Sequence, residues 1–185
     1  MRTAIFGGTF NPVHSAHLAM ARAAADQCAL ERVLFIPAGN PPHKETNTPY
    51  EHRLRMVELA CAADPRFVAS RMEEGKAKSY SINTIENLQA HMPGDELFFL
   101  IGSDAFEELQ TWRRWQDVAR AVQFIVVARP GHAIPQIPGT RVHLVEMPES
   151  DVSSSEIRRA HASGAVRNAL PEKVYEYIDA HGLYR

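Results

Sequence analysis

The chain has 185 residues, of which 45% are hydrophobic and 23% charged, and its formal net charge is −2. This length suits one domain with a sizeable core, and the ordinary charged fraction argues against wholesale disorder. A protein that binds duplex nucleic acid would normally be basic, so the net charge of this chain disfavours that role. It leaves room for an anionic small molecule, which needs only a few local cations. We expect a single domain over residues 1–185.

The cysteines and the lengths of the apolar runs indicate the cellular compartment of the protein. Cys28 and Cys61 lie far apart and form neither a CxxC pair nor a zinc-ligand spacing, which favours a reducing compartment. The longest apolar runs, 97–101 and 124–128, are far shorter than the ~20 residues of a membrane span. The first ten residues lack the pattern of a signal peptide. We therefore expect a cytoplasmic protein with no membrane partner.

Short apolar segments, rich in β-branched and aromatic residues, alternate with helical patterns along the chain. The expected strands cover 3–6, 33–37, 67–70, 97–102, 124–128 and 142–145. The expected helices cover 18–28, 51–63, 81–91, 154–162 and 171–180. Strand followed by helix at this spacing predicts βαβ units. The expected fold is a doubly wound, Rossmann-like α/β fold: a mostly parallel sheet with helices on both faces, which binds ligands at the carboxyl ends of its strands.

The first expected strand runs into the segment Gly7 to His17, which reads GGTFNPVHSAH. Its two glycines permit a tight turn and a close backbone approach, and the N–H groups of the helix that begins near His14 can hold a phosphate. Neither GxGxxG nor GxxxxGK[ST] is present, which disfavours a dehydrogenase cofactor site and a P-loop. His14 and His17 share one helix face and suit phosphate-facing donors. A zinc pair, which lacks an evident third ligand, and two capping or surface histidines are the alternatives.

This segment resembles the (T/S)-F-(D/N)-P-x-H-x-(G/A)-H signature of the nucleotidyltransferase superfamily with an HxGH motif. The motif reads His14-Ser15-Ala16-His17 here, so Ala16 replaces the usual Gly. Asn11 stands where Asp is more frequent, which keeps the hydrogen-bonding shape but removes a negative charge. Both departures from the signature are small in volume.

Later blocks resemble one branch of that superfamily, the nicotinate mononucleotide adenylyltransferases. In chain order they are the P-P-H-K loop at 41–44, S-Y-T-(I/V)-D-T at 79–84, I-G-x-D at 101–104, T-W-x-x-W at 111–115, R-P-G at 129–131 and I-S-S-T-x-I-R at 152–158. The substituted positions in these blocks are Ser81, Asn83, Val152 and Ser155. The resemblance runs through nearly the whole chain.

The resemblance implies transfer of the AMP moiety of ATP to nicotinate mononucleotide, giving nicotinate adenine dinucleotide and pyrophosphate in NAD biosynthesis. It implies Mg²⁺ bound through the ATP phosphates, and we name no protein residue as its ligand because Mg²⁺ usually keeps several waters and few protein ligands. The implied catalytic residues are His14, His17, Lys44 and Arg158. The implied ATP-binding residues are Gly7, Gly8, Thr9, Phe10, His14, His17, Gly102, Asp104, Ser154, Ser155 and Arg158. The implied mononucleotide-binding residues are Asn40, Lys44, Tyr80, Thr84, Trp112 and Arg129.

Plainer interpretations stay open for several of these residues. Lys44 alone would be a solvated surface cation, and the serines at 153–155 would form an ordinary helix cap. Tyr80 and Trp112 would be core aromatics, which is the role we assign to Trp115. Two other functions are also compatible with the residues: an adenylyltransferase or cytidylyltransferase of the same superfamily with another phosphate acceptor, and a nucleotide-binding regulator without catalysis. A homo-oligomer is compatible with the sequence.

Overall fold

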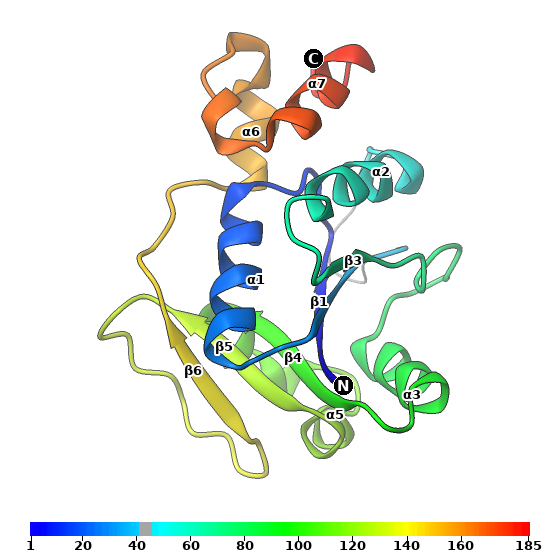
Figure 1. Ribbon diagram of the computed structural model, residues 1–185, viewed down its shortest axis with the longest axis vertical. Coiled ribbons are helices and arrows are strands. Elements are labelled where there is room, and N and C mark those ends of the chain that lie inside the picture. Colours follow the sequence, from blue (N-terminus) through cyan, green and yellow to red (C-terminus); the bar gives the residue numbers. More distant parts are fainter. Residues whose placement is uncertain (41–45) are drawn as a thin grey trace.

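The computed structural model describes residues 1–40 and 46–185 and is built on one six-stranded sheet (Figure 1). The strands are β1 (Arg2–Gly8), β2 (Arg32–Pro37), β3 (Phe67–Ala69), β4 (Glu96–Gly102), β5 (Gln123–Ala128) and β6 (Val142–Glu146). The helices are α1 (Ser15–Gln27), α2 (Tyr50–Cys61), α3 (Ser81–His91), α4 (Ser103–Glu107), α5 (Trp115–Ala121), α6 (Ser154–Ala160) and α7 (Glu172–Ala180).

The strand order places a ligand crevice beside β1. The sheet runs β3-β2-β1-β4-β5-β6, and every neighbouring pair is parallel. Ile5 of β1 lies opposite Leu34 of β2 on one side and Phe99 of β4 on the other. The chain order therefore reverses between β1 and β4, and ligands bind outside the carboxyl ends of the strands at such a reversal. The predicted doubly wound parallel fold is confirmed.

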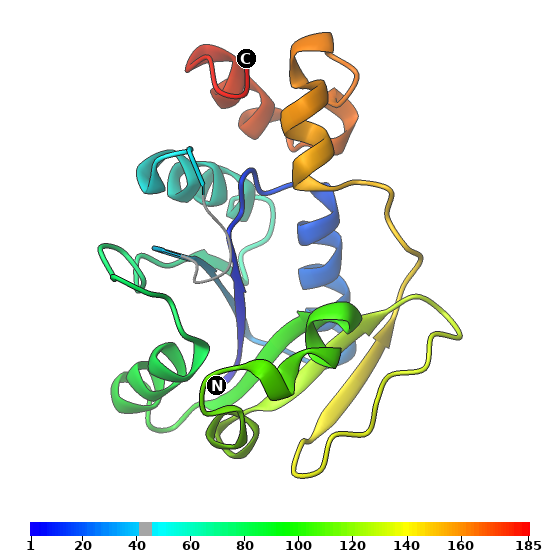
Figure 2. The same ribbon diagram turned by 180° about the vertical axis from the view of Figure 1, so that it is seen from behind.

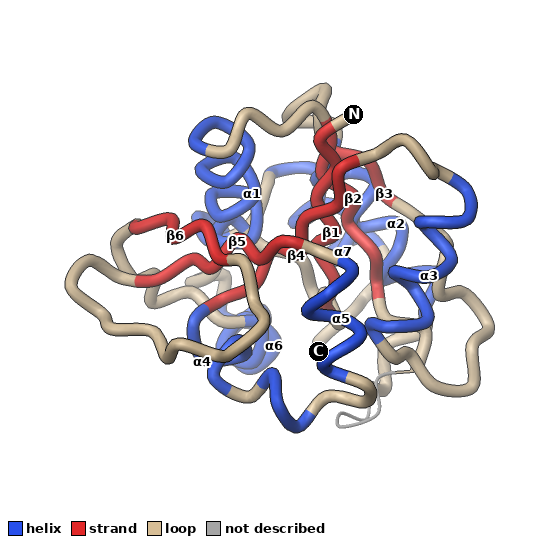
Figure 3. Tube along the Cα trace, turned by 90° about the horizontal axis from the view of Figure 1, so that it is seen from below, coloured by secondary structure: helices blue, strands red, loops and turns tan. Residues whose placement is uncertain are grey.

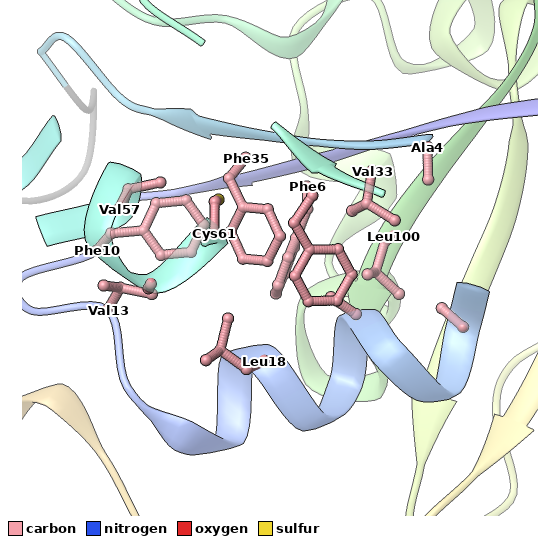
Figure 4. Close-up of a cluster of buried hydrophobic side chains, with 14 of the residues drawn as sticks. Ala4, Phe6, Phe10, Val13, Leu18, Val33, Phe35, Val57, Cys61 and Leu100 are labelled. Atoms are coloured by element: carbon pink, nitrogen blue, oxygen red, sulfur yellow. The ribbon is translucent and has the colours of Figure 1, made fainter. Parts of the chain in front are cut away.

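Helices cover both faces of the sheet, as Figure 3 shows with the strands running between them. On one face Phe6, Phe10 and Phe35 pack with residues of α1 and α2 (Figure 4). On the other face Ile5 and Phe99 pack with residues of α3, α4 and α5. Burying one such side chain contributes about 1.5–3 kcal/mol, so a strand that is apolar along its whole length stabilises the fold through both of its faces.

The α6–α7 region lies beyond the carboxyl end of β1, at the end of the molecule where α1 begins (Figures 1 and 2). Val174 and Ile178 of α7 are fully buried and belong to the same core as α1 and α2. His52 of α2 and the hydroxyl of Tyr177 in α7 form a hydrogen bond of 2.8 Å. The end of the chain is thereby attached to α2 by both apolar packing and a polar contact.

The expected strands and helices are all present, with ends that differ by at most three residues from those of the structure. The short helices α4 and α5 were not expected. Helix α5 has seven residues and follows Arg114, whose φ of 52° lies in the left-handed region, so it begins without a recognisable capping signal. Among the described residues, no helix is both long and apolar enough to cross a membrane.

Candidate active site

The loop between β1 and α1 turns sharply at Phe10. Its φ of 48° lies in the left-handed region, which costs roughly 1–3 kcal/mol and persists only where the surroundings determine it. The Phe10 ring is 3% exposed and packs edge-on against Phe6 and His17, with centroid distances of 5.6 and 5.1 Å. A Cβ on Gly8 would lie 3.1 Å from that ring, so glycine leaves the space for the turn.

His14 and His17 are in contact at the start of α1. Their rings stack with centroids 3.8 Å apart, and the backbone N–H of His14 donates to Nδ1 of His17 at 3.1 Å. Because Nδ1 of His17 accepts this bond, the neutral ring carries its proton on Nε2, where it can donate to a ligand. Burial lowers the pKa of His14 to about 4. The pKa of His17 is lowered to about 3, mainly by burial and to a smaller extent by electrostatic interaction with His14. Both imidazoles are therefore neutral at pH 7.

Two adjoining cavities flank this loop. The first, which we call the aromatic cavity, encloses about 550 Å³ and is lined by residues that include Gly7, Gly8, Thr9, Tyr80, Phe99, Gly102, Trp112 and Arg113. The second, the histidine cavity, encloses about 430 Å³ and is lined by residues that include His14, His17, Gly102, Asp104, Arg129 and His132. Gly102, the last residue of β4, lines both cavities. Each volume is that of an ordinary small-molecule site.

The aromatic cavity contains two of the predicted mononucleotide residues, Tyr80 and Trp112. Trp112 stands edge-on to Phe99 with ring centroids 5.5 Å apart, and the guanidinium of Arg113 lies 4.9 Å from the Tyr80 ring centroid. Tyr80 immediately precedes α3, which has no side-chain cap and therefore keeps free N–H groups at its N-terminus. Trp115 packs against the core and does not line this cavity, in keeping with the role expected for it.

The other predicted mononucleotide residues lie elsewhere. The side-chain amide of Asn40 donates to the carbonyl of Ala77 at 2.6 Å, and Asn40 lines neither cavity. Thr84 is buried and also lines neither cavity. Its hydroxyl donates to a carboxylate oxygen of Glu73 at 2.5 Å. Arg129 lines the histidine cavity. Lys44 lies outside the described residues.

The predicted phosphate-binding helix α6 contacts the loop between β1 and α1. The hydroxyl of Ser154 donates to the carbonyl of Pro12 at 2.9 Å, and Nη1 of Arg158 donates to the carbonyl of Asn11 at 2.8 Å. Nη2 of Arg158 donates to the hydroxyl of Ser155 at 3.3 Å. These contacts bring the predicted residues of α6 beside the loop that carries the histidines, although none of the three lines either cavity.

Arg53 is a structural member of the site that sequence reasoning missed. It is 1% exposed, and its Nη1 donates to the carbonyls of Thr9 and Ala38, each at 2.8 Å. A single guanidinium thus joins the loops that follow β1 and β2. The sequence does hold a signal, because Arg53 lies four residues before Val57 on the apolar stripe of α2, where a charge needs a partner.

Glu73 is a second residue that the sequence did not indicate. The residue is 7% exposed and lines the aromatic cavity, and its carboxylate accepts the bond from Thr84. Its backbone carbonyl lies where a Cβ on Gly39 would be, at 1.9 Å, so only glycine fits at that position of the loop after β2. No local motif announces this contact, because the two residues belong to different loops.

A group of potential metal ligands lies beside the histidine cavity. Ligand atoms of Asp104, Glu107 and His132 lie within 4.8 Å of one another, and His132 is already hydrogen-bonded to Glu107 at 3.2 Å. Mg²⁺ prefers octahedral oxygen ligands and keeps several waters, whereas an imidazole suits transition metals. The three residues therefore do not form a Mg²⁺ cage, although the carboxylate of Asp104 is an oxygen ligand of the right kind within the cavity.

Comparisons with known proteins agree on one family. The cytidylyltransferase-like family model matches residues 5–160. A Solibacter usitatus protein named "probable nicotinate-nucleotide adenylyltransferase" is 56% identical, and one of the same name from Thermus thermophilus is 42% identical, each over the full length of both chains. A Plasmodium falciparum nicotinic acid mononucleotide adenylyltransferase complexed with NaAD has the same fold, with a TM-score of 0.84, 17% identity and coverage of 99% of this chain and 97% of that one.

Proposed function

The chain belongs to the cytidylyltransferase-like family and, within it, to the nicotinate-nucleotide adenylyltransferases, and from this we propose that it transfers AMP from ATP to nicotinate mononucleotide. The observation that carries the proposal is the pair of cavities that meet at Gly102. A reaction that joins two nucleotides needs two sites whose reacting ends lie side by side. Chain length, fold and buried thiols further support a single domain, residues 1–185, that works in a reducing cytoplasm.

We assign the mononucleotide to the aromatic cavity. The Trp112 ring offers a flat partner for a pyridine, and offset stacking contributes about 0.5–1.5 kcal/mol beyond burial. The uncapped N-terminus of α3 and the guanidinium of Arg113 supply positive potential to the same cavity, whose lining also includes the carboxylate of Glu73. Nicotinate carries a carboxylate where nicotinamide has a neutral amide, so the helix N-terminus and Arg113 favour the acid form of the substrate.

We assign ATP to the histidine cavity, although three of the implied ATP-binding residues, Gly7, Gly8 and Thr9, line the aromatic cavity instead. The start of α1, with His14 and the Nε2 proton of His17, would hold the α- and β-phosphates. Arg158 and the N-terminus of α6 would hold the outer phosphates, while Gly102 and Asp104 would contact the ribose. Lys44, which lies outside the described residues, would offset charge between the two substrates.

The chemistry then needs positioning more than proton transfer. A phosphate oxygen of the mononucleotide attacks the α-phosphorus of ATP, the bond from that phosphorus to the bridging oxygen breaks, and pyrophosphate leaves with the electron pair. The attacking oxygen is already ionised at neutral pH, so no general base is required. Neutral imidazole donors and helix N–H groups stabilise the charge that builds on the phosphates. Mg²⁺, carried by the ATP phosphates, neutralises part of that charge when bound.

The direct test combines purified protein with ATP, Mg²⁺ and nicotinate mononucleotide and measures pyrophosphate together with the dinucleotide. We expect both products, with a higher kcat/KM for nicotinate than for nicotinamide mononucleotide. His17→Ala should lower kcat by at least about 10²-fold, since it removes a preorganised donor. His91→Ala is the matched control, because His91 is exposed at the far end of α3. Absence of pyrophosphate with a folded protein would indicate a nucleotide-binding regulator, and activity only with another phosphate acceptor would indicate a different transferase.

A further inference from the structure

The last residues of the chain fold back toward the loop that carries the histidines. After α7 the backbone turns at Gly182, and the amide of Leu183 donates to the carbonyl of Ile178 at 3.1 Å. Tyr184 then adopts a φ of 62°, a left-handed conformation that an aromatic residue keeps only where its surroundings impose it. The C-terminus lies at the same end of the molecule as α2, α6 and the start of α1 (Figures 1 and 2).

Asn11 is the point at which this tail meets the loop. The hydroxyl of Tyr184 donates to Oδ1 of Asn11 at 2.6 Å, and Nδ2 of Asn11 donates to the hydroxyl of Thr46 at 2.8 Å. The Asn11 carbonyl accepts the bond from Arg158 described above. Asn11 is 8% exposed, so water cannot readily replace the Tyr184 hydroxyl. One buried residue therefore connects the chain end, α6 and the segment that leads into α2.

Asn11 sits between the two residues that orient His17. Phe10, on one side, packs its ring against the His17 imidazole. His14, three residues on, donates its backbone N–H to Nδ1 of that imidazole. A movement of Asn11 is thus transmitted to His17 from two directions, and a misplacement of about 1 Å near reacting groups can cost 10²-fold in rate. Tyr184 lines neither cavity, so its hydroxyl acts on the site indirectly, and Asn11 is the hydrogen-bond partner that links it to the loop.

We propose that Tyr184 is a positioning residue for nucleotidyl transfer: its hydroxyl fixes the Asn11 amide, and through Asn11 it fixes the loop that presents His14 and His17. The kinetic part of this inference rests on the proposed function. The structural part, that the chain end holds the loop, stands independently of the substrate.

The test compares Tyr184→Phe with Tyr177→Phe. Each change removes one hydroxyl from the C-terminal region and one hydrogen bond, but the Tyr177 hydroxyl binds His52 and makes no contact with the loop. Tyr184→Phe should lower kcat about tenfold and leave both KM values within about twofold, while Tyr177→Phe keeps the wild-type kcat. In an Asn11→Ala background Tyr184→Phe should cause no further loss. Equal losses in the two single variants, an unchanged kcat in Tyr184→Phe, or a full additional loss in the Asn11→Ala background would overturn the proposal.

Amide hydrogen exchange separates this proposal from the proposed function. Exchange at residues 13–17 should be faster in Tyr184→Phe than in the wild type and unchanged in Tyr177→Phe. If the wild type released no pyrophosphate but exchange responded in this way, the proposed function would be wrong and the structural part of the inference, that Tyr184 holds the loop, would stand. If exchange at the loop were the same in all three proteins, the positioning role would be wrong whatever the activity.

Discussion

Replacing Arg53 with Met tests whether the buried guanidinium holds the active-site loops. The substitution removes two hydrogen bonds of 2.8 Å and one of 3.3 Å from a charged donor, each worth about 1.5–3 kcal/mol, and leaves the carbonyls of Thr9, Ala38 and Thr48 without that partner. Loss of the cost of burying the charge offsets part of this sum. We expect the free energy of unfolding to fall by about 3 kcal/mol. For a domain of this size, that corresponds to a Tm lower by about 6–12 °C.

The assay is urea unfolding followed by circular dichroism, with kcat and both KM values measured on the same preparations. Arg55→Met is the matched control, because Arg55 lies on the same helix with an exposed side chain paired to Glu58. Arg53→Lys keeps a charge without the planar fork and should fall between wild type and Arg53→Met. If Arg53→Met and Arg55→Met unfolded within about 0.5 kcal/mol of each other, the structural role of Arg53 would be refuted.

Three further outcomes are expected. Trp112→Ala should raise KM for the mononucleotide far more than KM for ATP, and equal effects on both would assign the ring to the core. Lowering the pH from 6.5 to about 4 should lower the free energy of unfolding, because His14 binds a proton in the unfolded state but stays neutral in the folded state. His14→Gln should make this loss of unfolding free energy smaller by about 3 kcal/mol. If the variant lost as much stability with acid as the wild type, the burial of the His14 ring would be contradicted. Gly39→Ala should lower the free energy of unfolding by about 1–3 kcal/mol relative to Gly94→Ala, whose added Cβ would have no atom within 4 Å. Equal unfolding curves for the two variants would show that the Glu73 carbonyl moves aside without cost.

The sequence predicted those parts of the site that are local in the chain. His14 and His17 are three residues apart on one helix, so their proximity follows from helical geometry alone. The continuous apolar strands predicted the parallel sheet, and with it that ligands would bind at the carboxyl ends of the strands; the adjacency of β1 and β4 was seen only in the structure.

Contacts between distant segments could not be predicted in the same way. The bond from Tyr184 to Asn11 spans 173 residues, and the bond from Arg53 to Thr9 spans 44. Neither has a local pattern, because each depends on how whole helices dock. Thr84 was placed at the mononucleotide by its match to a motif, yet in the structure it lies in α3 and its hydroxyl donates to Glu73, in the loop between β3 and α3. Motif matching transfers a residue's identity but not its hydrogen-bond partner.

Gly102, as the wall common to both cavities, has a consequence for ligand design. A compound that carries an adenine-like group and a pyridine-like group on a short tether could occupy both halves at once by crossing above a residue without a side chain. Linking two weak fragments in this way makes the second contact intramolecular, so the tethered compound should bind far more tightly than either fragment alone. Under the proposed assignment of the two substrates, the reaction product has the same two-part form and would have to leave both cavities together.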